Sequence, residues 1–201
     1  MARTVDPKKV NAVKNEIIDA SISLILDKGF SAFKLSSVAI KLGITKAALY
    51  WYFPTKEDLV ENIANHIRIS QLSFIRNIAD SKITAKEKLY KLLDSIEENK
   101  KSCMLPIKML IEYYSEENFI KVEIQKGYRE YVEILSNILL EGKNNQEFST
   151  IIPEEELSRL LVSTIDGIVI HNSTFENNYV ISKNSFSIIL ESMLIPYREI
   201  V

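Results

Sequence analysis

Glycine, proline and cysteine are all scarce in this sequence. Five glycines and five prolines stand among 201 residues, whereas sandwich and barrel folds need these residues at many tight turns. The single cysteine cannot form an internal disulfide, which fits a reducing compartment. No uninterrupted apolar stretch reaches the roughly 18 residues of a membrane-spanning helix, and the charged residues 1–10 do not resemble a signal peptide. These absences favour an all-α, cytoplasmic protein that does not contact a membrane.

Positive charge is concentrated at the start of the chain. Residues 1–56 carry nine Lys and Arg but only four Asp and Glu, a formal charge of +5, and the remaining residues carry −7. A basic segment on an acidic body suggests a surface for a polyanion such as DNA. An ordinary solvated face explains the charge equally well, so the motif within this segment has to decide between the two.

Apolar residues recur at helical spacing along almost the whole chain. The stop signals include Gly29 and Gly43, and Thr84 with Glu87 is typical of a capping box at a helix start. We therefore predict an all-α fold with an N-terminal three-helix helix-turn-helix domain over residues 1–55 and a larger helical domain over residues 56–201. The predicted helices run over about 10–26, 35–42, 46–53, 56–74, 85–99, 102–114, 120–138, 154–169 and 186–194.

The strongest motif lies in residues 35–53, which read LSSVAIKLGITKAALYWYF. A short amphipathic helix ends at Gly43, and Thr45 is a good N-cap for a second short helix that Pro54 ends. This is a helix-turn-helix arrangement, whose second helix lies in the DNA major groove. The small residues Ala47 and Ala48 let that helix approach the DNA closely.

Side chains of this second helix have the chemistry of DNA contacts. Thr45 and the free N–H groups beside it suit a phosphate, and Lys46 can reach a phosphate or a guanine edge. Tyr50 and Trp51 offer apolar faces to thymine methyl groups, while the hydroxyls of Tyr50 and Tyr52 can donate to phosphates. A buried aromatic stripe is the alternative interpretation, but five consecutive large residues over 49–53 cannot all face one core.

The same region resembles the N-terminal domain of the TetR family of bacterial transcriptional regulators. The matching motifs fall in register without a gap: Gly29-Phe30, Val38-Ala39, Gly43-Ile44-Thr45-Lys46, Leu49-Tyr50, Tyr52-Phe53 and Lys56-Glu57-Asp58-Leu59. The resemblance covers about residues 10–60, and beyond them only the helix order and the pair Asp166-Gly167 are similar to the family. It implies a homodimer that binds a palindromic operator in double-stranded DNA. It also implies a second domain that dimerises and binds a small molecule, which usually relieves repression.

Carried over position by position, the resemblance also implies which residues face the DNA: Ser36, Thr45, Lys46, Ala47, Tyr50, Trp51, Tyr52 and Lys56. Ser36 would contact the DNA backbone from the first helix of the motif. Two positions depart from the family pattern. Lys34 stands where a capping Thr or Ser is common, and Trp51 stands where relatives often have His.

The acidic part of the chain supplies aromatic walls and a few polar groups suited to a small-molecule cavity. The ligand-binding candidates are Cys103, Tyr113, Tyr114, Tyr128, Tyr131, His171 and Phe175, although each is also explained by core packing. Because the net charge of this part is −7, an apolar or cationic effector suits it better than an anionic one.

The penultimate long helix carries two apolar stripes, and a helix that is apolar on more than one side is usually buried on more than one side. A second copy of the chain is the simplest partner for the extra stripe. The predicted dimer interface is formed by the second stripe together with the last helix, through Val162, Ile165, Val169, Ile189 and Met193.

No catalytic or metal-binding pattern accompanies these motifs. His66 and His171 lie far from each other and from Cys103 in sequence, so they give no zinc or haem spacing. The chain has no glycine-rich phosphate loop and no spacing that suggests a catalytic triad. We therefore expect no enzyme activity, no metal and no cofactor. The competing hypotheses are a ligand-independent DNA-binding factor, a helical protein–protein adaptor and a helical-bundle enzyme.

Overall fold

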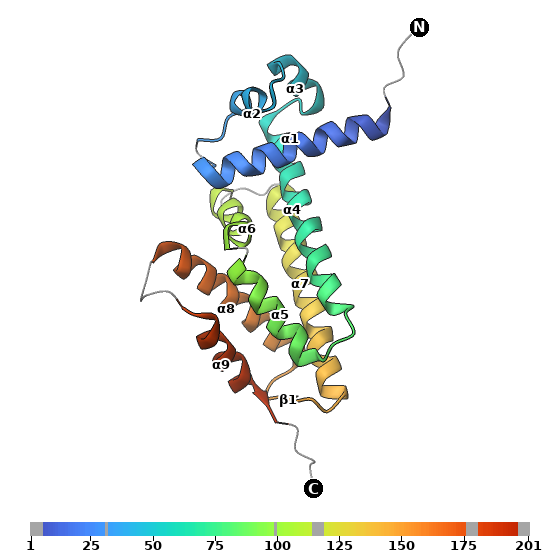
Figure 1. The fold of residues 1–201 in the computed structure, drawn as a ribbon, viewed down its shortest axis with the longest axis vertical. Helices are drawn as coiled ribbons and strands as arrows, with labels where there is room; N and C mark the ends of the chain where they lie inside the picture. The colour runs from blue at the N-terminus through green and yellow to red at the C-terminus, as the bar shows by residue number, and fades with distance from the viewer. Residues whose placement is uncertain (1–5, 31, 99, 114–118, 176–180, 197–201) are drawn as a thin grey trace. The chain divides into compact units, whose positions relative to one another are not determined.

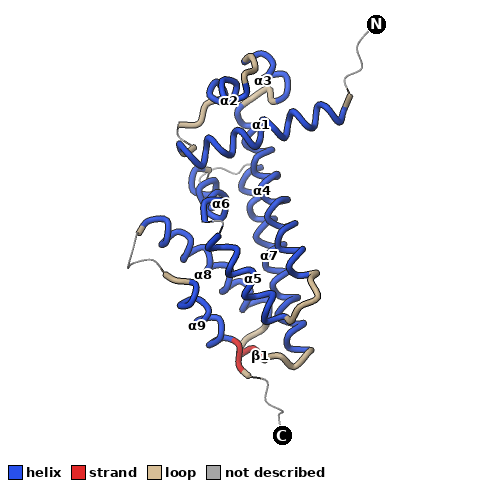
Figure 2. Tube along the Cα trace, viewed as in Figure 1, coloured by secondary structure: helices blue, strands red, loops and turns tan. Residues whose placement is uncertain are grey.

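The computed structural model describes residues 6–30, 32–98, 100–113, 119–175 and 181–196. Within these ranges the chain forms nine α-helices and one two-stranded sheet (Figures 1 and 2), which confirms the predicted all-α class. None of the described helices combines the length and the apolar character that a bilayer crossing needs. The chain divides into two compact units, residues 1–68 with 108–124 and residues 69–107 with 125–201.

The first unit contains α1 (Pro7–Lys28), α2 (Leu35–Leu42), α3 (Lys46–Tyr52) and the start of α4 (Lys56–Ala79). The α1 helix begins earlier than the apolar pattern predicts, because the Asp6 carboxylate caps it by accepting the Lys8 N–H at 3.0 Å. The core of this unit joins all four helices, through the fully buried side chains of Ile17, Val38, Leu49, Phe53 and Leu59.

Part of α4 and residues 108–124 belong to the same unit as the helix-turn-helix. In this unit the Arg68 Nε of α4 donates to the Glu123 carboxylate at 2.8 Å, and Glu123 is almost fully buried. The sequence predicts a domain boundary after residue 55, where the DNA-binding role is expected to end. The compact unit that contains the helix-turn-helix continues beyond this residue.

The second unit contains α5 (Ala85–Glu98), α8 (Glu154–Thr174) and α9 (Lys183–Met193), together with the end of α4, most of α6 (Lys100–Glu112) and most of α7 (Phe119–Asn144). The predicted capping box begins α5, because the Thr84 N–H donates to Glu87 at 2.9 Å and the Glu87 N–H donates to Thr84 Oγ1 at 3.2 Å. One continuous apolar core fills the unit, with Leu92, Leu135, Leu161 and Leu190 among its buried members.

Two features of the second unit were not predicted. Strand β1 (Ser149–Thr150) pairs antiparallel with β2 (Leu194–Ile195), with Ser149 opposite Ile195. The last helix therefore ends at Met193 instead of continuing through Leu194. Pro106, expected near a helix start, lies in the middle of α6, where its ring removes one backbone hydrogen bond.

Candidate nucleic-acid interface

The turn between α2 and α3 has the geometry that the motif predicts. Gly43 ends α2 in the left-handed conformation with φ 65° and ψ 26°, which glycine adopts without steric cost. The Ile44 N–H donates to the Ala39 carbonyl at 3.0 Å, closing the helix end. Lys34 makes no side-chain capping bond, yet α2 still begins at Leu35 as predicted. The residue order therefore sets a tight, defined turn before α3.

Helix α3 has one buried and one exposed face. Its first turn is capped by Thr45, whose Oγ1 accepts the Ala48 N–H at 3.1 Å. Leu49 is 1% exposed and fixes the helix to the core of the first unit. By contrast, Tyr50 is 46% exposed and Trp51 is 59% exposed. The buried-stripe interpretation is therefore wrong for these two aromatic side chains.

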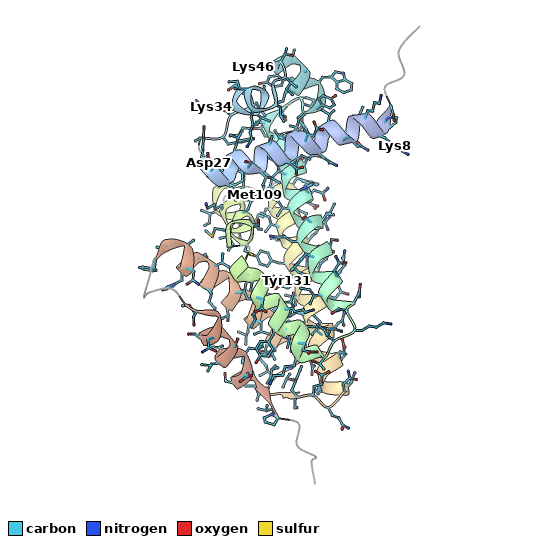
Figure 3. The ribbon with its side chains drawn as sticks, in the orientation of Figure 1. Lys8, Asp27, Lys34, Lys46, Met109 and Tyr131 are labelled. Atoms are coloured by element: carbon cyan, nitrogen blue, oxygen red, sulfur yellow. The ribbon has the colours of Figure 1, made fainter. Side chains whose placement is uncertain are left out.

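The exposed side chains of α3 share one side of the helix. Lys46, Ala47, Tyr50 and Trp51 are all exposed, and they occupy positions i, i+1, i+4 and i+5, which a 3.6-residue period places together. Figure 3 shows Lys46 at the start of this helix. A cation, a small residue and two aromatic rings thus form an open surface on a short, well-anchored helix, as a major-groove reader requires.

The remaining DNA-contact candidates lie at the edges of this surface. Tyr52 is half-buried and its ring packs edge-on against Trp51 at 4.7 Å between centroids. Lys56 is half-buried, with its Nζ 5.7 Å from the centre of the Phe33 ring. Ser36 is half-buried in the first turn of α2. These three side chains are less accessible than those on the exposed face of α3.

One exposed apolar side chain of the same unit was not predicted to lie on the surface. Ile40 of α2 is 81% exposed, and its neighbour Lys41 donates from Nζ to Ser23 Oγ at 2.6 Å. Its exposure could have been predicted, because Ile40 lies off the apolar seam formed by Leu35, Val38 and Leu42. Ile40 is therefore an additional exposed apolar side chain of the helix-turn-helix.

The ligand-binding candidates do not form one group. Tyr128, Tyr131 and Cys103 pack against the core of the second unit, and the Tyr128 hydroxyl donates to Asp166 Oδ2 at 2.6 Å. Burial is the main cause that raises the pKa of the Cys103 thiol, and the nearby Asp166 charge acts in the same direction. This thiol is consequently a poor nucleophile at neutral pH.

The other aromatic candidates lie elsewhere. In the second unit, the rings of His171 and Phe175 stand 4.7 Å apart near the end of α8. Tyr113 belongs to the first unit, where its ring meets Phe30 edge-on at 6.2 Å. Tyr114 lies outside the described residues. The described part of the chain contains no group of three or more His, Cys, Asp or Glu that could hold a metal ion.

Three of the predicted dimer residues are packed inside the chain itself. Val162, Ile165 and Val169 are between 4% and 8% exposed and belong to the core of the second unit, so their side chains cannot face a partner. Ile189 is exposed and Met193 is half-buried. Of the first predicted stripe, Leu157 and Leu161 are also buried whereas Leu160 is exposed, so the burial of α8 does not divide along the two predicted stripes.

Comparisons with known proteins agree with this geometry. Residues 17–63 match the family model described as bacterial regulatory proteins, tetR family, and residues 88–181 match the tetracyclin repressor-like C-terminal domain. The fatty acid metabolism regulator protein of Bacillus subtilis (strain 168) is 26% identical over 158 residues, which are 77% of this chain and 80% of that protein.

Solved structures give the same fold. The reduced form of E. coli NemR aligns with a TM-score of 0.82 at 14% identity, covering 94% of this chain and 100% of that chain. A transcriptional regulator of the TetR/AcrR family from Thermobifida fusca YX-ER1 aligns with a TM-score of 0.64 at 26% identity, with coverage of 94% and 100%.

Proposed function

Because the chain belongs to the TetR family of DNA-binding transcriptional regulators, we propose that it represses transcription by binding a palindromic operator as a homodimer. Residues 1–55 bind the DNA, and residues 56–201 dimerise and bind a small apolar or cationic effector that releases the operator. The observation that carries the proposal is the exposed face of α3, where Lys46, Tyr50 and Trp51 project from a helix anchored by buried Leu49.

Each side chain of this face has a defined task on DNA. Lys46 reaches a phosphate or a guanine edge, and Ala47 leaves room for close approach of the helix. Tyr50 and Trp51 contact thymine methyl groups through their rings, and Ser36, Thr45, Tyr52 and Lys56 contact the DNA backbone. The positive charge of residues 1–56 strengthens association with any DNA, so the α3 face has to supply the sequence preference.

Effector binding is linked to DNA binding through two states of the dimer. A dimer reads two half-sites about one helical turn apart, so the spacing of its two α3 helices sets operator affinity. An effector that binds one spacing better shifts the population toward it. If that spacing does not match successive major grooves, operator affinity falls and transcription is no longer repressed.

Exposed apolar residues on α8 and α9 support dimerisation through these helices. On α8, Leu160 and Ile170 are exposed, and Gly167 lies between them with open space where a side chain would project. On α9, Ile188 is 63% exposed and Ile189 is also exposed. Exposed apolar side chains on two helices are typical of an association surface, and the small residue permits close approach.

Replacing Leu160 and Ile188 together with Glu should convert the dimer to monomers, because the charges would be desolvated at the interface. Sizing chromatography with light scattering at fixed protein concentration measures the change, and the helical circular dichroism should stay the same because both positions are exposed. Ile111→Glu, at an exposed apolar position of α6, is a control outside α8 and α9 and should remain dimeric. A fully dimeric double variant would contradict the interface.

The proposed function is tested with DNA that flanks the gene of this protein. The full chain should retard one fragment at concentrations that leave a scrambled duplex of equal length free, and the logarithm of affinity should fall linearly with the logarithm of salt concentration. Equal affinity for all duplexes would contradict operator recognition and favour a nonspecific DNA-binding factor. Failure to retard any duplex would contradict the DNA-binding role of α3.

A further inference from the structure

Asp166 of α8 lies where three helices of the second unit meet. From α7, the Tyr128 hydroxyl donates to Asp166 Oδ2 at 2.6 Å. From α6, the Met104 sulfur lies 3.7 Å from the Ser173 hydroxyl of α8, which brings Cys103 and Met104 alongside α8. Figure 3 places Tyr131, one helical turn from Tyr128, among the helices of the same unit. The carboxylate therefore contacts the Tyr128 hydroxyl, and Tyr131 and the Cys103 thiol lie near enough for its charge to raise their pKa values.

The negative charge of Asp166 has no cationic partner among the described residues. Tyr128 is its hydrogen-bond donor there, and no Lys, Arg or His side chain of the described ranges forms an ion pair with it. Desolvation by burial raises the pKa of the Asp166 carboxyl, and the Tyr128 hydrogen bond opposes this shift without cancelling it. Asp166 is half-buried, and a carboxylate that loses part of its hydration is normally paired with a cation.

The groups around Asp166 suit a cation. Burial is the main cause that raises the pKa values of Tyr131 and Tyr128, and the nearby Asp166 acts in the same direction, so both rings stay neutral at physiological pH. Neutral phenol rings attract ammonium groups through their faces. An anionic molecule would be repelled, and an apolar one would bury the carboxylate further without compensating its charge.

We propose that Asp166 is the counter-ion of a cationic effector, an organic ammonium ion whose charge lies against the Asp166 carboxylate and the rings of Tyr128 and Tyr131. This inference rests on the proposed function, in which a small molecule binds the second domain. It selects the cationic class over the apolar class and assigns a residue to the charge. The competing role for Asp166 is structural, as an acceptor that holds Tyr128 of α7 to α8.

Charge separates the two roles, so Asp166→Asn is the informative variant. The Asn side-chain oxygen can still accept the Tyr128 hydroxyl, whereas the negative charge is lost. The probe is phenyltrimethylammonium, and its neutral isostere is tert-butylbenzene. Titration calorimetry on the full chain should show that the cation binds the unmodified protein at least about tenfold more tightly than the isostere. Asp166→Asn should remove this difference.

Glu156→Gln is the matched control, because Glu156 is exposed on the same helix and the change removes the same net charge. It should leave the affinity for phenyltrimethylammonium unchanged. Three results would overturn the inference: no binding of the cation to the unmodified protein, equal binding of the isostere, or equal loss of affinity in Glu156→Gln and Asp166→Asn. The last result would assign the effect to the overall charge of the domain.

Stability provides a readout that does not need a ligand. Since burial raises the pKa of Asp166 in the folded state, ionisation costs stability as pH rises above the unfolded value of about 3.9. Tyr128, Tyr131 and Cys103, which face it, stay neutral over pH 4–8 because their pKa values are also raised. Asp166→Asn should therefore unfold at a higher temperature than the unmodified protein at pH 8, with a smaller difference at pH 4. A lower unfolding temperature at pH 8 would support the structural role and overturn the inference.

DNA binding distinguishes failure of this inference from failure of the proposed function. Asp166→Asn should retain operator affinity without the probe, because Asp166 belongs to the second unit and the α3 face to the first. If the unmodified protein binds operator DNA specifically but does not bind phenyltrimethylammonium, the inference about the cation alone is wrong. If it does not bind DNA specifically, the proposed function itself is wrong.

Discussion

Lys46→Ala should weaken operator binding by about 1–3 kcal/mol in each half-site if Lys46 reads a base, and by about twice that for the dimer. Lys46 is exposed at the start of α3, and that helix is held in place by the Thr45 cap and by buried Leu49. The fold should consequently be unaffected. If Lys46 contacts only a phosphate, the loss should be similar on every sequence and the salt dependence should become shallower.

Fluorescence anisotropy with operator and scrambled duplexes at several salt concentrations measures both quantities. Lys82→Ala is a suitable control, because Lys82 is an exposed lysine of the second unit and its loss changes the net charge equally. Tyr50→Ala tests the aromatic part of the same face. If both Lys46→Ala and Tyr50→Ala bind the operator as tightly as the unmodified protein, α3 is not the recognition helix.

Val169→Asp should destabilise the fold by about 3–5 kcal/mol, a large fraction of the total stability of a typical domain. Val169 is 4% exposed within the core of the second unit, so a carboxylate placed there loses its hydration without gaining a partner. Urea unfolding followed by circular dichroism measures the loss as a lower transition midpoint.

Leu160→Asp provides the contrast on the same helix. Leu160 is 47% exposed, so an added charge stays hydrated in the monomer and the urea midpoint of the isolated chain should change little. Its effect should instead appear as dissociation of the dimer on sizing. Equal midpoints for Val169→Asp and the unmodified protein would contradict the inward orientation of this stripe.

The turn between α2 and α3, the start of α5 and the exposed face of α3 were predictable because local chemistry determines them. Gly43 adopts the conformation that a glycine after a helix is expected to adopt, and Thr45 and Thr84 make the capping bonds that their positions indicate. The exposure of Tyr50 and Trp51 followed from the 3.6-residue period once the turn fixed the start of α3. Each of these features depends on residues that lie within about two helical turns of one another.

Features that depend on distant pairs could not be read from the sequence. Tyr128 and Asp166 are separated by 38 residues along the chain, and helices α8 and α9 lie between the paired strands β1 and β2. Apolar residues occur on several sides of α8, so only the packing of neighbouring helices decides that Val169 faces inward and Leu160 outward. Local periodicity gives the faces of a helix but not their partners.

Selection of binding sequences from random double-stranded DNA by the full chain tests the central claim most directly. The account predicts an enriched inverted repeat whose half-sites lie one helical turn, or a multiple of it, apart. Selection with Lys46→Ala or Tyr50→Ala should relax the preference at matching positions in both half-sites. An enriched sequence without two-fold symmetry, or one that neither substitution changes, would contradict a dimer that reads DNA through α3.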